Sequence, residues 1–511
     1  MTTASAWSVA LLGMTGTLVE VEAAIAPGLP RTVLVGLPDA ALYEARDRCR
    51  AAIAGAGLNW PSQLLTINLT PASLPKAGSH YDLAIVSAVL ACAGAVPRQI
   101  LAGAVLAGEL GLDGRVRPVR GILPTLLTAR EAGFSTAVVP AGQVGEARLV
   151  SGLTVWGVGN LAELVEVLHG RPVLATSDAV TGDTPEPAGA PDLADVRGQP
   201  EACWAVEVAA AGGHHIFLHG APGVGKSMLA ARLPGLLPEL SDAHALEVSA
   251  LHSLAGEPLA SGLIRRPPYV NPHHNASVAA MVGGGSRMAR PGAISLAHRG
   301  VLFLDEAPEF SGRVLEALRT PLETGEVLIA RSASQVRYPA RFQLVLAANP
   351  CPCGRGGSPA GQCTCAPMAL RRYRERLSGP VMDRIDIHHR MLPNLRALAE
   401  TYGGEASAVV AGRVGQARSR ARRRLRDTPW QLNAEVPGHQ LRKLSAIHGT
   451  DLLDEAVRTG RLSARGVDKV IRIAWTLADL AGRDRIARDR IARADLAAAL
   501  GLRQDCWGSA P

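Results

Sequence analysis

The stretch GAPGVGKS, from Gly220 to Ser227, has the residue types and spacing needed to hold phosphate. Glycines let the backbone turn tightly, so that its N–H groups point at an anion, and the start of a following helix adds a favourable dipole. In such a loop, Lys226 would reach the β- and γ-phosphates of a nucleotide, and Ser227 would bind Mg²⁺. The predicted nucleotide-binding residues are Gly220, Ala221, Pro222, Gly223, Val224, Gly225, Lys226 and Ser227.

Polar residues also follow two apolar stretches later in the chain. The run VLFL ends in Asp305 and Glu306, and the run FQLVLAA ends in Asn349. An aspartate at a strand end can bind Mg²⁺ through water, and the adjacent glutamate can orient and deprotonate an attacking water. The amide of Asn349 could hydrogen-bond that water or the γ-phosphate, although taken alone it is better explained as a turn before Pro350. Beside the phosphate loop, these residues predict a site that hydrolyses ATP with Mg²⁺.

The phosphate loop needs a strand before it and a helix after it, and the sequence offers both. β-like and helical runs alternate over residues 1–170 and again over residues 195–395. Between them, residues 171–194 are rich in Pro, Gly and Asp and predict a linker. Residues 396–511 are rich in Arg and Ala with helical spacing. We therefore expect a multidomain α/β protein with a helical C-terminal part.

Composition limits the class of protein. The chain has 511 residues, of which 47% are hydrophobic, as in globular proteins with several cores. A formal net charge of +8 is compatible with a polyanionic partner but is weak evidence over this length. No basic segment precedes the first apolar run, and the longest uncharged apolar run, LAIVSAVLACAGAV, is too short to span a bilayer. We expect a cytoplasmic protein without a membrane partner.

The phosphate loop, the strand-end carboxylates and Asn349 together resemble those of the AAA+ ATPases. The stretches RPPYVNPHHNAS, GAISLAHRGVLFLDEAPEF, ANPCPCG and RLSGPVMDRIDIH resemble magnesium-chelatase-like AAA+ proteins, and more narrowly the YifB/ComM family. The resemblance covers nearly the whole chain. It implies an AAA+ core at residues 195–395 and a helical lid, similar to the magnesium-chelatase C-terminal region, at residues 396–511.

The same resemblance completes the ATPase site. Asn349 would be sensor 1, Arg384 the arginine finger, and Arg465 the sensor-2 arginine of the lid. An arginine finger neutralises charge that develops on the γ-phosphate and is often supplied by a neighbouring subunit. A ring is therefore implied, with a hexamer as the expected homo-oligomer. Taken alone, each of these arginines would more often be a solvated surface residue.

One stretch departs from the family pattern RPFRxPHH. The matching residues here read RPPYVNPHH, from Arg266 to His274, so that Pro268 and Tyr269 replace the aromatic residue and the second arginine. The function of that second arginine is therefore left open in this chain. Adjacent histidines on a loop, such as His273 and His274, more often form hydrogen bonds than bind a metal.

Four cysteines follow Asn349 directly as two C-x-C pairs: Cys351, Cys353, Cys363 and Cys365. Four thiolates can surround one ion tetrahedrally, and Zn²⁺ is the ion favoured by thiolates in a reducing compartment. Because four protein ligands leave no open position, such a zinc would be structural. The alternative is a set of free thiols on a loop.

The N-terminal region resembles the proteolytic domain of Lon-type proteases in AGELGLDGRVRPVRGILPTLLTAREAGFSTAVVP and in PKAGSHYDLAIVSAVL. Lon-type chemistry needs a nucleophilic serine with a lysine as its general base. Ser79 lies near the nucleophile position, but no lysine follows Lys76 within this region. We expect a degenerate Lon-like domain at residues 1–170 that serves as a scaffold or partner surface, and no active protease.

Arginines are candidate DNA contacts, because neutralising phosphates gives affinity without reading sequence. The resemblance implies that the hairpin matching GEVLIARSASQVRYPARF projects into the ring pore, and the Gly-rich stretch GGGSRMARPG is a second candidate for facing it. The candidates in these two stretches are Arg331, Arg337, Arg287 and Arg290. Arg418, Arg422 and Arg426 share one helical stripe, for which a solvated face is an equal alternative.

Three functions fit these features. The first is a ring-forming ATPase that remodels DNA as a helicase or by branch migration, as ComM-type relatives imply for DNA uptake and recombination. The second is a chelatase-type ATPase acting in metal insertion or on a protein client, although chelatase motor subunits as a class lack the Lon-like domain. The third is an ATP-driven protease, against which the missing lysine argues. Stimulation of ATP hydrolysis by DNA distinguishes the first from the others.

Overall fold

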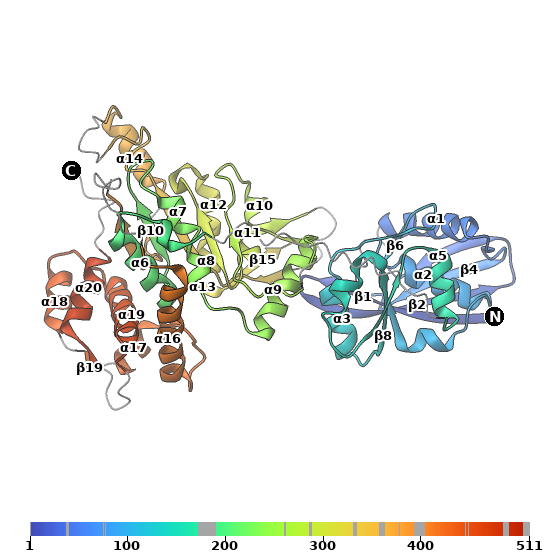
Figure 1. Ribbon diagram of the computed structural model, residues 1–511. Helices are drawn as coiled ribbons and strands as arrows, with labels where there is room; N and C mark the ends of the chain where they lie inside the picture. Colours follow the sequence, from blue (N-terminus) through green and yellow to red (C-terminus); the bar gives the residue numbers. More distant parts are fainter. Residues whose placement is uncertain are drawn as a thin grey trace.

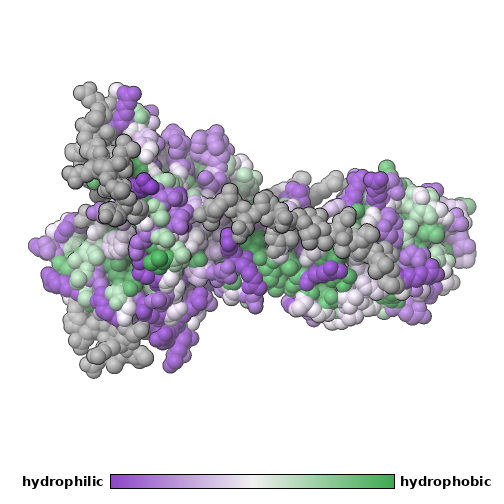
Figure 2. Space-filling model, viewed as in Figure 1, coloured by the Kyte–Doolittle hydropathy of each residue, from purple (hydrophilic) through white to green (hydrophobic). Residues whose placement is uncertain are grey.

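The computed structural model has two lobes joined at a narrower waist (Figures 1 and 2). The structure describes residues 2–36, 40–74, 76, 78–171, 191–259, 262–285, 289–330, 335–356, 363–377, 379–392, 404–444, 446–447, 449–483 and 490–503. The blue-to-teal lobe in Figure 1 contains the N-terminal residues, and the other lobe contains the central and C-terminal residues. Within the described residues, no helix combines the length and the apolar character needed to cross a membrane.

The N-terminal lobe is built on a mixed sheet with strand order β3-β4-β2-β1-β5-β8-β9. β1 and β2 form a long antiparallel hairpin in which Leu12 pairs with Thr15, and Gly13 takes the positive φ of 66° that its tight turn needs. The strands are β1 (Thr2–Leu12), β2 (Thr15–Ala26), β3 (Arg31–Val35), β4 (Leu64–Thr70), β5 (Ala104–Leu106), β8 (Thr136–Pro140) and β9 (Thr154–Val158), with a separate hairpin of β6 (Glu109–Leu110) and β7 (Val116–Arg117).

Helices cover this sheet, and the most apolar of them forms the centre of the lobe. The helices are α1 (Ala40–Gly55), α2 (Asp82–Cys92), α3 (Ile122–Glu131), α4 (Val144–Ala147) and α5 (Leu161–Leu168), with 3-10 turns at Gln99–Gly103 and Ala141–Gln143. Every residue of α2 is buried, which explains the uncharged run LAIVSAVLAC. The run is apolar on all sides because the helix is packed on all sides.

The central region holds a parallel sheet with strand order β11-β14-β17-β10-β18. Its strands are β10 (Ile216–His219), β11 (Tyr269–Val270), β14 (Val301–Leu304), β17 (Gln343–Ala348) and β18 (Ile387–Arg390). The side chains of β10, β14 and β17 are buried throughout, because helices cover both faces of a parallel sheet. The order places β17 between the strand before the phosphate loop and the strand before Asp305, so their carboxyl ends lie side by side.

The helices of this region are α6 (Pro200–Gly212), α7 (Lys226–Ala230), α8 (Leu233–Leu236), α9 (Asp242–Ala255), α10 (Val278–Val282), α11 (Ala293–Leu296), α12 (Gly312–Ala317), α13 (Arg319–Thr324), α14 (Pro367–Glu375) and α15 (Gly379–Met382). Two antiparallel hairpins stand outside the sheet: β12 (Gly283–Gly284) with β13 (Arg290–Pro291), and β15 (Glu326–Ala330) with β16 (Gln335–Pro339). A 3-10 turn at Ala307–Glu309 follows β14.

The C-terminal region is mainly helical, as expected, with one small exception. Its helices are α16 (Ser407–Leu425), α17 (Gly438–Leu444), α18 (Thr450–Arg458), α19 (Ala464–Leu480) and α20 (Arg493–Gly501), with a 3-10 turn at Asn433–Glu435. The exception is a short parallel pair of β19 (Ala446–Ile447) and β20 (Arg490–Ile491). α16 and α19 pack against α6, so one hydrophobic core is shared by the central and C-terminal regions.

Most of the predicted linker, residues 172–190, lies outside the described residues. The last residues of the predicted linker, 191–194, pack against the second lobe. Leu193, in a 3-10 turn at Leu193–Asp195, is buried, and its backbone N–H donates to the Ser407 hydroxyl over 2.7 Å. The chain therefore joins the second lobe before residue 195.

The two lobes meet where α3 packs on α9. The backbone N–H of Gly121 donates to the Ser253 carbonyl over 3.1 Å, and the Ser253 hydroxyl donates to the buried Glu146 carboxylate over 2.5 Å. Burial raises the pKa of Glu146. Leu11 and Met14, next to the β1–β2 turn, pack against cores of both lobes, so the contact is apolar as well as polar.

Candidate functional site

The loop between β10 and α7 has the backbone that close approach of phosphate requires. Gly223 and Gly225 take positive φ angles of 81° and 94°. A Cβ at Gly220 would lie 2.4 Å from the carbonyl oxygen of Met391, so only glycine fits there. The loop lies at the carboxyl end of β10, the edge at which ligands bind in open α/β sheets.

Lys226 links this loop to Asn349. Its Nζ donates to the carbonyls of Gly220 and Ala221 over 2.7 and 3.0 Å, and to Oδ1 of Asn349 over 3.0 Å. Burial lowers the pKa of Lys226, while Asp305 and Glu306 act in the opposite direction. The lysine of the loop and the amide at the end of β17 are thus brought together, as parallel strand ends predict.

Ser227 and Asp305 lie in direct contact across the sheet edge. The Ser227 hydroxyl donates to Oδ2 of Asp305 over 2.6 Å. A hydroxyl and a carboxylate are oxygen ligands of the kind that Mg²⁺ prefers. The two predicted Mg²⁺ ligands therefore converge on one place beside the phosphate loop, and their chemistry fits that ion.

Glu306 has an uncommon backbone conformation and an unexpected neighbour. Its φ of 50° is in the left-handed region, which is costly for a residue with a side chain and often marks a functional site. Its Oε2 lies 3.6 Å from Nδ1 of His274, and the ring of His273 packs on His274 with centroids 4.1 Å apart. Sequence reasoning assigned these histidines no partner, because the loop that brings them to Glu306 has no local signal.

The two arginines assigned by resemblance are held by other groups. Arg384 donates to the Pro380 carbonyl over 2.5 Å and to the Glu323 carboxylate, and its side chain is 14% exposed. Arg465, at the start of α19, is 75% exposed and lies 3.4 Å from Asp383. None of these bonds involves the phosphate loop. The roles of both arginines remain predictions.

A buried polar cluster around Asp386, two residues after Arg384, was not predicted. Asp386 accepts from His214, whose ring also contacts the Thr476 hydroxyl at 2.8 Å, and it lies 3.4 Å from Nζ of Lys469 on α19. Burial lowers the pKa of Lys469 to about 8. Asp386 belongs to the segment DRID that was singled out for Arg384, so the cluster ties that segment to the C-terminal helices.

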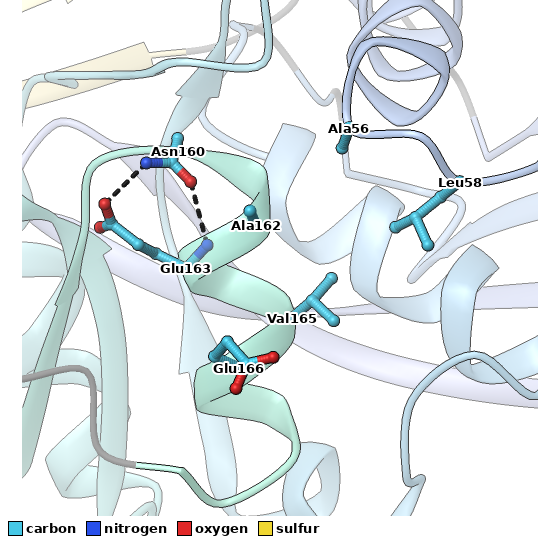
Figure 3. Close-up of a pocket in the computed structure, with 7 residues that line it drawn as sticks. All are labelled: Ala56, Leu58, Asn160, Ala162, Glu163, Val165 and Glu166. Atoms are coloured by element: carbon cyan, nitrogen blue, oxygen red, sulfur yellow. Dashed lines mark hydrogen bonds between the residues drawn. The ribbon is translucent and has the colours of Figure 1, made fainter.

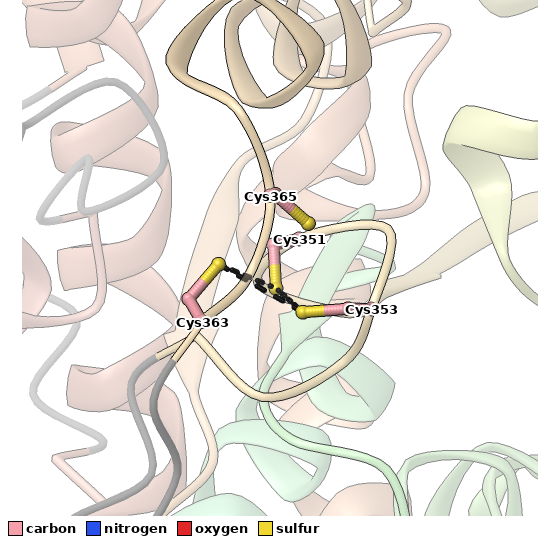
Figure 4. Close-up of side chains that lie close together, drawn as sticks. All are labelled: Cys351, Cys353, Cys363 and Cys365. Atoms are coloured by element: carbon pink, nitrogen blue, oxygen red, sulfur yellow. Dashed lines mark hydrogen bonds between the residues drawn. The ribbon is translucent and has the colours of Figure 1, made fainter.

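The four cysteines after Asn349 come together (Figure 4). Their Sγ atoms all lie within 4.8 Å of one another, with separations of 3.3 Å for Cys351–Cys353, 3.6 Å for Cys363–Cys351 and 3.8 Å for Cys353–Cys363. Zn–S bonds of about 2.3 Å in a tetrahedron separate the sulfurs by about 3.8 Å. Hydrogen bonds from the Arg355 backbone and from Cys351 lower the pKa of Cys353 to about 6, which favours a thiolate. The cluster therefore fits a tetrahedral thiolate site.

Two of the four candidate DNA contacts can be located. Arg337 on β16 is 72% exposed and lies 3.6 Å from Glu326, and Arg290 is exposed on β13. The two hairpins are neighbours, since the Tyr338 hydroxyl donates to the Ala289 carbonyl over 2.6 Å. The turn of the β1–β2 hairpin also packs against β16, since a Cβ at Gly13 would lie 2.7 Å from a side-chain atom of Val336. The other candidates, Arg331 and Arg287, lie outside the described residues.

The arginine stripe predicted on the C-terminal region is wrong at its first member. Arg418 on α16 donates to the carbonyl of Ala210 from Nε and Nη2, over 2.9 and 2.7 Å. It therefore caps the end of α6 and is not available to phosphate. Arg422 and Arg426 are exposed. Helical spacing places the three residues on related faces, but it does not reveal that α6 covers part of the stripe.

The N-terminal lobe holds Ser79 and Lys76 in separate interactions. The Ser79 hydroxyl donates to the Glu109 carboxylate, and Nζ of the buried Lys76 donates to the Pro71 carbonyl. Burial lowers the pKa of Lys76. Ser79 and Lys76 thus bond to different partners in these interactions. The expected loss of protease chemistry stays a prediction.

A shallow pocket of about 500 Å³ lies between the end of α1 and α5 (Figure 3). Asn160 caps α5 by accepting from the Glu163 backbone over 3.0 Å, and the Glu163 carboxylate accepts in return from Asn160. Ala56, Leu58 and Val165 supply apolar surface. The polar groups drawn together in this pocket serve the helix cap, so it is not a candidate active site.

Three family models match successive parts of the chain. Residues 192–398 match magnesium chelatase, subunit ChlI; residues 21–143 match subunit ChlI of Mg-chelatase; and residues 404–503 match the C-terminal part of the same subunit. The N-terminal match carries the chelatase name as well. The presence of an N-terminal domain is therefore no argument against a chelatase-type function.

Full-length relatives are known. An uncharacterised protein of Mycobacterium tuberculosis is 53% identical over 98% of this chain and 98% of its own. The uncharacterised protein YifB of Escherichia coli is 40% identical over 93% of each chain. The competence protein ComM of Haemophilus influenzae is 36% identical over 98% of each chain. The similarity thus runs from end to end and is not confined to the nucleotide loop.

Proposed function

The chain belongs to the YifB/ComM family of magnesium-chelatase-like proteins, and we propose that it is a ring-forming AAA+ ATPase that couples ATP hydrolysis to DNA remodelling. The observation that carries the ATPase proposal is the convergence of two pairs at one sheet edge. Lys226 bonds to Asn349, and Ser227 bonds to Asp305. These four residues come from three adjacent strand ends, where an ATP-hydrolysing site needs them.

Each residue has a distinct task in this proposal. Mg²⁺, when bound by Ser227 and Asp305, neutralises charge on the phosphates of ATP. Lys226 exchanges its present acceptors for the β- and γ-phosphates. Glu306 takes the proton of the attacking water, and Asn349 orients that water or the γ-phosphate.

Two arginines complete the proposed ATPase. Arg384 acts as the arginine finger of a neighbouring subunit, and Arg465 contributes from the C-terminal helices, which serve as the lid. Arg384 is already preorganised by Glu323, and Arg465 lies next to Asp383 in the same segment. A finger supplied by a neighbour requires a closed ring, for which a hexamer is the proposed form.

The DNA part of the proposal rests on the two adjacent hairpins and on the relationship to ComM. Arg337 and Arg290 are exposed on hairpins that are joined through Tyr338, and two further arginines belong to the same stretches. Such a cluster suits phosphate contacts along a strand. Helicase action or branch migration in DNA uptake or recombination is the proposed activity.

We also propose that the four cysteines hold a structural zinc. Three of the sulfur separations, from 3.3 to 3.8 Å, lie near the separation of about 3.8 Å in a tetrahedral zinc–thiolate site. With four protein ligands the ion has no open position for a substrate. Zinc would close the loop between the two C-x-C pairs.

ATP hydrolysis by the purified protein tests this function. The rate is measured without DNA and with single-stranded, duplex and four-way-junction DNA, with Lys226→Ala and Glu306→Gln as inactive controls. We expect hydrolysis that at least one DNA form stimulates. Hydrolysis that ignores every DNA form would remove the DNA proposal and leave the ATPase proposal intact.

A chelatase-type function is the second candidate, because all three matching family models carry that name. In that case the ATPase would drive metal insertion or act on a protein client. Its test is Mg²⁺ insertion into protoporphyrin with chelatase partner subunits. We expect no insertion, since the end-to-end similarity to ComM favours the DNA proposal.

A further inference from the structure

The cysteine cluster lies directly against the residues that would handle the γ-phosphate. Cys351 is only two residues after Asn349, is buried, and accepts a hydrogen bond from the Gly356 backbone over 3.1 Å. No residue separates the amide from the cluster except Pro350, which restricts the backbone between them. The position of Asn349 therefore depends on how firmly the first C-x-C pair is held.

A second connection returns from the far side of the cluster. α14 begins two residues after Cys365, and the backbone of Asn349 lies close enough to the hydroxyl of its Tyr373 to oppose the rise in pKa that burial causes. Tyr373 is buried, 4% exposed. Asn349 and Tyr373 thus lie near each other, and all four cysteines stand between them in the sequence.

A third contact reaches the phosphate loop itself. Gly354, in the turn after Cys353, packs on Pro222 so closely that a Cβ would lie 2.5 Å from its Cγ. Gly354 has a φ of 75°, so the turn both needs glycine and lacks room for a side chain. The turn after Cys353 therefore contacts the phosphate loop that carries Lys226, while Cys351 follows the strand end that carries Asn349.

We propose that metal bound by Cys351, Cys353, Cys363 and Cys365 sets the position of Asn349, so that ATP hydrolysis depends on zinc although zinc takes no part in the chemistry. The inference rests on the proposed ATPase function and on the proposed zinc. Without a metal, four thiolates repel one another, and no bond holds the four cysteines together. The loop would then no longer fix the amide that orients the water or the γ-phosphate, while Ser227 and Asp305 would keep their places on other elements.

The test compares zinc-loaded and zinc-free full-length protein. Zinc is removed under reducing conditions with a zinc-selective chelator, Mg²⁺ is kept in excess, and zinc is then added back. We expect about one zinc per chain, a fall in kcat of about tenfold to a hundredfold on removal, and recovery on addition of zinc. Affinity for a fluorescent ADP should change less than threefold, while affinity for the matching ATP analogue falls further, because ADP lacks the γ-phosphate beside which Asn349 would act.

Three variants separate metal binding from its effect on ATP hydrolysis. Cys353→Ser should lose zinc and lose activity, whereas Cys203→Ser, a thiol of α6 outside the cluster, should lose neither. Tyr373→Phe should keep its zinc and yet lower kcat severalfold, which a merely structural zinc would not explain. Circular dichroism and size exclusion establish that each protein is folded.

The possible failures are distinct. A protein that contains no zinc and takes up none contradicts the metal site, whatever its ATPase rate. Zinc that can be removed and restored with kcat and the ATP-to-ADP affinity ratio unchanged contradicts the coupling to Asn349. A protein that never hydrolyses ATP contradicts the proposed function, and the affinity ratio then still decides the coupling.

Discussion

Replacing His274 by alanine tests how the resting site holds Glu306. Nδ1 of His274 lies 3.6 Å from Oε2 of Glu306, and the two side chains are 31% and 49% exposed. His274 is charged only when it is protonated, and with both groups charged a pair exposed to this degree contributes about 0.2–1 kcal/mol. The pair could hold the Glu306 carboxylate away from the water that Glu306 must deprotonate. Because about 1.36 kcal/mol corresponds to a factor of ten, losing a pair of at most about 1 kcal/mol can raise the active population by about fivefold at most.

The expected result is a moderate rise in DNA-free ATP hydrolysis for His274→Ala. The rise should be largest at low salt and shrink as salt increases, because screening weakens a surface ion pair in the parent protein as well. Glu306→Gln should instead lower the rate by at least about a hundredfold, since it removes the general base. His169→Ala changes an exposed histidine directly after α5 in the other lobe, and as the control it should leave the rate unchanged.

Two results would refute this reasoning. A fall of more than tenfold in His274→Ala would mean that the histidine assists catalysis and does not restrain the base. A rise far above fivefold, or one that is the same at every salt concentration, would exceed what a half-exposed ion pair can supply.

The remaining predictions concern the core, the lid and the candidate DNA contacts. Burial lowers the pKa of His215 from 6.5 to about 4, so the unfolded chain binds a proton at a higher pH than the folded chain does. The free energy of unfolding should therefore fall by up to about 3 kcal/mol as the pH drops from 6.5 to 4. In denaturant unfolding, His215→Asn should make the free energy of unfolding depend less on pH over this range, and an unchanged pH dependence would refute the assignment. Lys469→Met removes the lysine paired with the buried Asp386 and should lower the free energy of unfolding by about 3 kcal/mol. A change below about 1 kcal/mol, the level of a surface pair, would show that this pair does not hold α19 against the central region. Arg337→Ala should weaken DNA binding, measured by fluorescence anisotropy, and should reduce the slope of log K against log salt concentration by about one. The control Arg313→Ala, on α12, should change neither the affinity nor the slope. Equal behaviour of the two variants would exclude the β15–β16 hairpin from the DNA site.

The arrangement of the candidate nucleotide site could be predicted in part because its signals are local. A strand, a glycine-rich turn and Lys226 stand next to one another in sequence, and Asp305 and Asn349 each end an apolar run. Parallel strands place their carboxyl ends at one edge, so the contact between Lys226 and Asn349 follows once the strand order is known. The strand order itself required the structure.

Other features depend on contacts between distant segments, and the sequence did not show them. The pair of Asp386 with Lys469 joins β18 to α19, and His274 reaches Glu306 from a loop. Arg418 illustrates the limit of periodicity, because helical spacing identifies a face but not the helix that covers it. The short β19–β20 pair was missed because two-residue strands carry no alternation of apolar and polar residues.

The most direct test of the central claim is ATP-dependent remodelling of a four-way DNA junction by the purified protein, followed through a fluorescent label on one strand. The proposal predicts that wild-type protein converts the junction into its product duplexes only when ATP and Mg²⁺ are present, and that Glu306→Gln binds the junction without converting it. A wild-type protein that hydrolyses ATP at full rate and leaves every junction and forked duplex unchanged would contradict the claim that this ATPase acts on DNA.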